Sequence, residues 1–95
     1  MLKVVASQKV MEDKVEQFVE LAKELVVASK AEERNIDYSL NRKVDDPNVY
    51  CFIEVWEDKD ALDAHMASEH FQRIAPRLGT CVEEGTTQMG VYATF

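Results

Sequence analysis

The chain has 95 residues, of which 46% are hydrophobic and 31% charged, so its composition fits one globular domain over residues 1–95. Eighteen acidic residues against eleven basic ones give a net charge of -7. That charge argues against binding to nucleic acid or to anionic membranes, which both need a basic surface. No segment approaches the roughly 20 apolar residues of a spanning helix. Because residues 1–11 alternate rather than form a signal peptide, we expect a cytoplasmic protein without membrane contact.

The two cysteines, Cys51 and Cys81, have no CxxC spacing and no histidine cluster beside them. This pattern favours small, buried, apolar side chains in a reducing compartment over a disulfide, a metal ligand or a nucleophile.

The first half of the chain predicts a strand and then a long helix. Residues Leu2–Met11 alternate between apolar and polar side chains, as a strand does. Asp13, with Glu16 three residues later, resembles a capping box, so we expect Asp13 to be the N-cap of the helix. Apolar and small residues then recur at helical spacing over about five turns. They are Val15, Phe18, Val19, Ala22, Leu25, Val26 and Ser29.

A hairpin follows the helix. The alternating segment Asn35–Asp45 and the segment Val49–Glu57 flank a turn built on Asp46, Pro47 and Asn48. The second of these strands is apolar on both faces, which indicates that both faces are covered.

Two shorter helices and a last strand complete the chain. Asp58 is positioned to cap a helix that ends near Met66, and Ser68 to cap another. We expect Pro76 to distort this last helix and Gly79 to end it in the left-handed conformation.

A final strand is predicted over Thr86–Phe95, so the order is β-α-β-β-α(α)-β. This order predicts an α+β fold of the ferredoxin-like type, an antiparallel sheet with its helices on one face. The other face of such a sheet is bare and here includes an apolar row, which predicts a homodimer.

Glu54 is unusual because it lies between Phe52 and Trp56 on one face of a buried strand. A carboxylate there must be paired, hydrogen-bonded or neutral. It is therefore either part of a structural ion pair near the strand end or dimer interface, or a pocket carboxylate that orients a base or a substrate hydroxyl.

His65 lies on the apolar side of the second helix, where a core position and a catalytic base are both open interpretations. His70 is near the start of the third helix, a place that often leaves a side chain solvated. Aromatic residues that can be either core or pocket wall accompany them. They are Tyr38, Tyr50, Phe52, Trp56 and Phe71.

Several site motifs are absent: no GxGxxG or Walker loop, no HExxH or Cys/His cluster, and no GxSxG segment. Nucleotide cofactors, metals and an elbow-type nucleophile therefore gain no support from the sequence.

The segment Phe52–Phe71 resembles the signature of the antibiotic biosynthesis monooxygenase (ABM) domain family. Its pattern F-x-E-x-W followed by A-L-x-x-H-x-x-S-x-H-F is present without a gap. Upstream, Ala31–Glu33 before Tyr38 is similar to the family's E-E-G-C-x-x-Y segment, with Arg34 and Asn35 in place of Gly-Cys.

The resemblance implies a dimeric α+β barrel and an oxygenase acting on small aromatic or quinol substrates with O2, without metal, flavin or haem. By position it implies His65 as the base and Glu54 as its orienting partner. It also implies a substrate-binding wall from Trp56, Tyr38, Phe52 and Phe71, with His70 beside it.

The sequence argues against a haem-degrading branch that shares this fold. That branch has a tryptophan on the second helix and an axial histidine ten residues later, whereas the matching positions here are His65 and Ala75, so the axial haem ligand is missing. An isomerase that uses His65 and Glu54 on a small metabolite stays open, as does a dimeric protein that only binds a small ligand.

Overall fold

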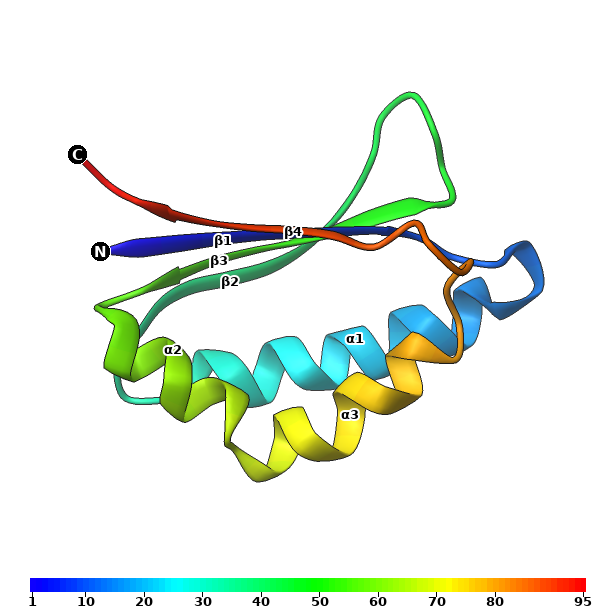
Figure 1. Cartoon of the computed structure of the whole chain (residues 1–95). Helices are drawn as coiled ribbons and strands as arrows, with labels where there is room; N and C mark the ends of the chain where they lie inside the picture. Colours follow the sequence, from blue (N-terminus) through cyan, green and yellow to red (C-terminus); the bar gives the residue numbers. More distant parts are fainter.

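The computed structural model describes residues 1–95 as one four-stranded antiparallel sheet with its helices on one side (Figure 1). The strands are β1 (Leu2–Lys9), β2 (Asn35–Arg42), β3 (Val49–Trp56) and β4 (Gln88–Ala93). The helices are the 3₁₀ turn η1 (Glu12–Lys14), α1 (Val15–Lys30), α2 (Lys59–Met66) and α3 (Glu69–Gly79). The strand order is β2-β3-β1-β4, so the predicted ferredoxin-like α+β fold is confirmed.

Two predicted helix ends are wrong. Asp13 is not an N-cap, because the chain enters α1 through the turn η1, and neither helix start has a side-chain cap hydrogen bond. Gly79 does not adopt a positive φ, because the Thr80 N–H donates to the carbonyls of Arg77 and Leu78 and closes the helix in right-handed geometry. The left-handed residue is Gly85, with φ of 79°, on the way to β4.

The strands are also shorter than predicted at their ends. β1 stops at Lys9, with only an isolated bridge from Val10 to Val82 beyond it, and β4 covers six residues. α3 continues through Pro76 to Gly79.

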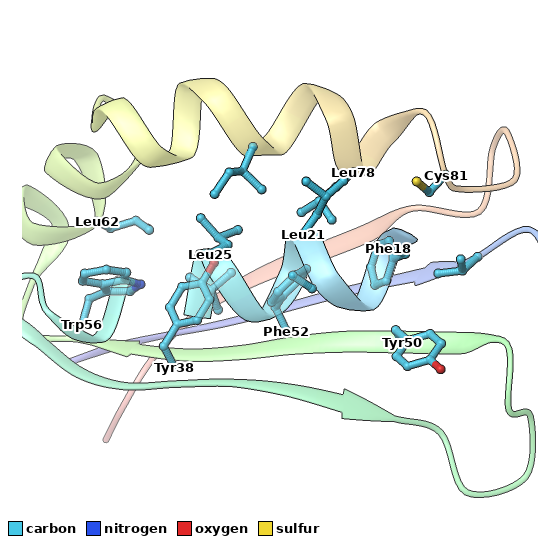
Figure 2. Packing of buried hydrophobic residues seen from close by; sticks show 14 of the residues in the cluster. Phe18, Leu21, Leu25, Tyr38, Tyr50, Phe52, Trp56, Leu62, Leu78 and Cys81 are labelled. Atoms are coloured by element: carbon cyan, nitrogen blue, oxygen red, sulfur yellow. The ribbon is translucent and has the colours of Figure 1, made fainter. Parts of the chain in front are cut away.

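The two faces of β3 have different surroundings. Tyr50, Phe52, Glu54 and Trp56 are buried toward the helices, and Figure 2 shows the three aromatic side chains of this face in the core. The alternate residues are half-buried and face the side without helices, which we call the open face. They are Val49, Cys51, Ile53 and Val55.

Both cysteines are free, and Cys81 is buried as predicted. Cys51 is only half-buried, because it lies on the open face of β3, where no helix of this chain covers it. No helix is long and apolar enough to cross a membrane.

Two predicted caps fix the starts of α2 and α3. The Asp58 carboxylate accepts a hydrogen bond from the Ala61 N–H at 2.9 Å, and the Ser68 hydroxyl accepts one from the Phe71 N–H at 3.3 Å. Each cap satisfies a backbone donor that the helix itself cannot pair. The caps therefore determine where the side chains of α2 and α3 point.

We predict that Asp58→Ala lowers the free energy of unfolding by about 1 kcal/mol, because the Ala61 N–H loses its acceptor. Asp58→Asn should retain most of the stability, since Asn is an equally good N-cap. Urea unfolding at one protein concentration measures both. An equal loss in the two variants would instead assign the effect to the half-exposed ion pair between Asp58 and Arg34.

Candidate functional site

Glu54 of β3 is buried in the core, with 6% of its surface exposed. Its Oε1 accepts a hydrogen bond from the Trp56 indole N–H at 2.9 Å. Burial raises the pKa of Glu54, and the hydrogen bond from Trp56 opposes that shift. No lysine or arginine pairs with it; the nearest basic nitrogen is Nε2 of His65, 4.0 Å from Oε1. The carboxyl therefore belongs to an internal site beside His65.

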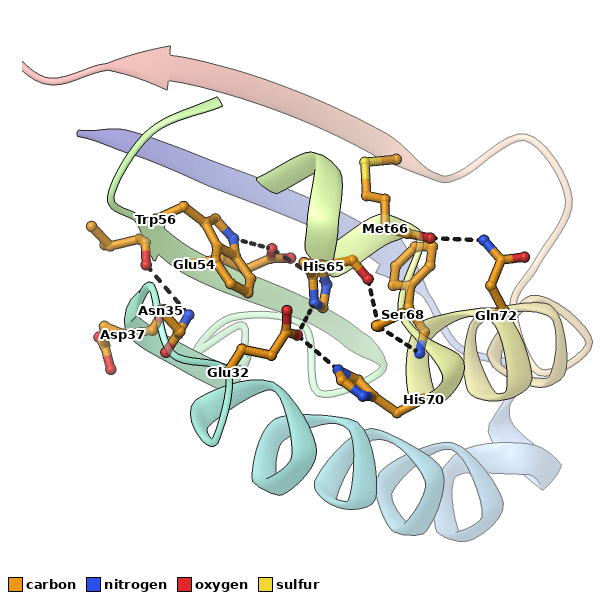
Figure 3. Close-up of polar contacts among 12 residues, drawn as sticks. Glu32, Asn35, Asp37, Glu54, Trp56, His65, Met66, Ser68, His70 and Gln72 are labelled. Carbon is orange, nitrogen blue, oxygen red and sulfur yellow. Dashed lines mark hydrogen bonds and ion pairs between the residues drawn. The ribbon is translucent and has the colours of Figure 1, made fainter. Parts of the chain in front are cut away.

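His65 extends from α2 into the core, and only 1% of it is exposed (Figure 3). Its Nδ1 lies 2.7 Å from Oε2 of Glu32. Because a carboxylate only accepts, Nδ1 carries the proton and Nε2 presents a lone pair. That Nε2 is buried and has no hydrogen-bond partner. Burial lowers the pKa of His65, and the negative charge of Glu32 opposes the shift.

Glu32 is the site residue that the sequence reasoning did not single out. It lies in the turn between α1 and β2, and its Oε2 is 2.7 Å from both His65 Nδ1 and His70 Nε2 (Figure 3). The only signal for it was its place in the segment Ala31–Glu33 of the family resemblance. His70 is not a solvated residue, because its side chain is 17% exposed and bound to Glu32.

Three aromatic rings surround the His65 imidazole. The ring centroids of Trp56, Phe71 and Tyr38 lie 4.6, 5.0 and 5.3 Å from that of His65. Burial, and then the nearby charge of Glu54, raises the pKa of the Tyr38 hydroxyl, so it remains protonated. The His65 imidazole is thus fixed both by packing against these three rings and by its hydrogen bond to Glu32.

Two adjoining cavities lie on the helix side of the sheet. One of about 60 Å³ is lined by His65 and Glu54, and one of about 240 Å³ is lined by Tyr38 and Phe52. Glu54, Phe71 and Met89 line both. Of the predicted substrate-binding residues, Trp56 and His70 line neither cavity.

Both cavities lie on the helix-facing side of β3. The arrangement offers a proton acceptor, a neighbouring carboxyl group and a largely apolar wall, which are the parts of a site for deprotonating an apolar, hydroxyl-bearing molecule.

The family model for antibiotic biosynthesis monooxygenase (ABM) matches residues 1–77. The chain belongs to the ABM family. A relative from Bacillus subtilis (strain 168), named putative monooxygenase YcnE, is 41% identical over 64 residues, which is 67% of each chain.

Solved structures agree with the ABM fold. A conserved protein from Methanosarcina mazei Go1 has a TM-score of 0.94 at 33% identity, with 99% of this chain and 92% of that one covered. A crystal structure of an antibiotic biosynthesis monooxygenase has a TM-score of 0.92 at 30% identity, covering 100% and 99%.

Replacing Glu54 separates its hydrogen bond from its charge. We expect Glu54→Gln to be at least as stable as the parent near neutral pH, because the amide oxygen still accepts from Trp56 while the buried charge is gone. Glu54→Leu should lower the free energy of unfolding by about 1–3 kcal/mol, since the Trp56 N–H is left unpaired. Denaturant unfolding compares the three proteins. A glutamine variant as unstable as the leucine variant would show that the charge itself stabilises the fold.

Proposed function

We propose that this chain is a cofactor-independent monooxygenase that oxidises a small aromatic or quinol substrate with O2. The observation that supports this most is Nε2 of His65, a buried lone pair on the cavity wall with no partner in the protein. The family membership and the relative named as a monooxygenase support the same class of reaction.

In the first step of the proposed reaction, Nε2 of His65 takes the proton of a phenol or quinol hydroxyl. Glu32 stabilises the imidazolium through its hydrogen bond to Nδ1. In this scheme Glu32, rather than Glu54, is the orienting partner of His65. Burial lowers the pKa of His65, which keeps the imidazole neutral and ready to accept a proton.

Glu54 has a different role in the proposal. Its Oε1 is 4.0 Å from His65 Nε2, too far for a hydrogen bond but close enough for one substrate oxygen to contact both groups. Burial raises the pKa of Glu54, which makes its protonated form easier to reach, and in that form the carboxyl group can donate to the substrate oxygen after deprotonation. Tyr38, Phe52 and Phe71 supply walls for the ring.

The oxidation itself is then carried by the substrate anion. The anion gives one electron to O2, and the two radicals recombine to form a peroxide on the ring. His65 returns the proton it removed to the peroxide, and the ring carbon that carries the peroxide then loses its own proton as the O–O bond breaks. One oxygen atom stays on the product as a carbonyl, and the other leaves as water made with these two protons. A largely apolar cavity suits this step because it keeps solvent from the anion.

The functional unit in this proposal is a homodimer that packs open face against open face. The β3 residues of the open face are apolar, and no helix of the chain covers them. Burial of such a face in a second copy is the arrangement that the ferredoxin-like dimeric barrel provides.

Oxygen uptake with a panel of reduced quinols and phenols tests the reaction. We expect His65→Ala to lower kcat/KM by about 10²–10⁴-fold, the usual contribution of a general base. Glu32→Gln should lower kcat by about 10–100-fold through loss of a charge-assisted hydrogen bond, with little change in KM.

Glu33→Gln is the matched control, because Glu33 is an exposed carboxylate next to Glu32. Unchanged turnover in both His65→Ala and Glu32→Gln would contradict the assignment. Conversion of a substrate without oxygen uptake would instead favour an isomerase, and binding without conversion would favour a ligand-binding protein.

The dimer is tested by replacing Ile53, at the centre of the open-face row of β3. We expect Ile53→Asp to shift the protein from dimer to monomer in sedimentation or light scattering, because two buried charges would face each other across the interface. Val27→Asp is the control, since Val27 is 72% exposed on α1, in the helix layer. Monomeric parent protein at micromolar concentration would refute the interface.

A further inference from the structure

Glu32, His65 and His70 form a cluster of side chains that can bind a metal ion. The proposed reaction does not require a metal at this place. The cluster offers one carboxylate oxygen and two imidazole nitrogens, and these three atoms lie within 4.8 Å of one another. Two histidines and one carboxylate are typical ligands of zinc and of similar divalent transition metals. We propose that Glu32, Nδ1 of His65 and Nε2 of His70 bind one such ion, which switches His65 to its other tautomer.

The three donor atoms must rearrange around an ion, because the two imidazole nitrogens, which lie within 4.8 Å of each other, have to stand about 3.3 Å apart. Zinc holds nitrogen and oxygen ligands at about 2.0–2.2 Å, so donors around one tetrahedral ion are about 3.3 Å apart. Oε2 of Glu32 is now 2.7 Å from each nitrogen and must move outward by about half an ångström. Glu32 lies in a short turn rather than inside a helix, and its side chain is 17% exposed. A water molecule completes the coordination, as in other three-ligand sites.

The surroundings of His65 also favour a metal on Nδ1. Metal-bound histidines usually donate their second ring N–H to a carboxylate, which fixes the ring and the tautomer. Glu54 is placed for this task, because its Oε1 is 4.0 Å from Nε2 and needs to approach by about 1 Å to accept. The buried Nε2 that has no partner in the hydrogen-bonded cluster would then gain one.

Metal binding and base catalysis exclude each other in this arrangement. A metal on Nδ1 leaves the proton on Nε2, so the lone pair that faces the cavity is lost. The metal site itself does not depend on the proposed monooxygenase reaction; only inhibition by the metal rests on it.

Titration of the tag-free protein with Co2+, followed by its visible absorption, tests the site without any substrate. We expect one ion per chain, with the bands of a low-coordinate ion, and displacement by Zn2+. Glu32→Gln and His70→Ala should each weaken binding at least tenfold, whereas Glu33→Gln should bind like the parent protein. Circular dichroism of each variant confirms that the fold is kept.

Nitrogen NMR of the histidine rings supplies a second readout. We expect the His65 proton on Nδ1 without metal and on Nε2 after Zn2+ is added. Absence of saturable binding, equal weakening by Glu33→Gln and Glu32→Gln, or a His65 proton that stays on Nδ1 would each overturn the proposal. If the protein turns over a quinol, Zn2+ should inhibit the parent more strongly than His70→Ala; equal inhibition would refute the link to catalysis but not the binding site.

Discussion

The contacts of one carboxylate, Glu32, determine which nitrogen of His65 carries the proton. Its Oε2 binds both His65 and His70, so it joins the turn after α1 to the two helices that follow β3. Because a carboxylate cannot donate, it places the proton of His65 on Nδ1 and leaves Nε2 free. Without Glu32, a buried imidazole would have two polar atoms without partners, at a cost in stability.

β3 connects this site to the rest of the molecule. Its alternation places Glu54 and Trp56 under the helices and Ile53 and Val55 on the open face. A one-residue shift in the pairing of this strand would exchange the two sets, so the register with β1 and β2 fixes the site and the open face together. The proposed reaction and the proposed dimer therefore depend on the same strand.

Much of the fold was predictable from local patterns. Helical spacing located α1, and the side chains of Asp58 and Ser68 marked the starts of α2 and α3, because a cap is a contact between near neighbours in the chain. The same local reasoning was wrong for Asp13 and Gly79. Asp13 does not act as an N-cap because the chain enters α1 through the turn η1. Gly79 does not adopt a left-handed conformation because α3 ends in right-handed geometry at Thr80.

The sequence by itself determined which residues carry reactive groups on buried surfaces: Glu54 on an apolar strand and His65 on an apolar helix face, within the pattern of the ABM family. Only the tertiary structure decided which carboxylate binds which nitrogen. Glu32 is 33 residues from His65 along the chain and 2.7 Å from it in space. No local pattern encodes such a contact, because it arises from packing the turn after α1 against α2 and α3.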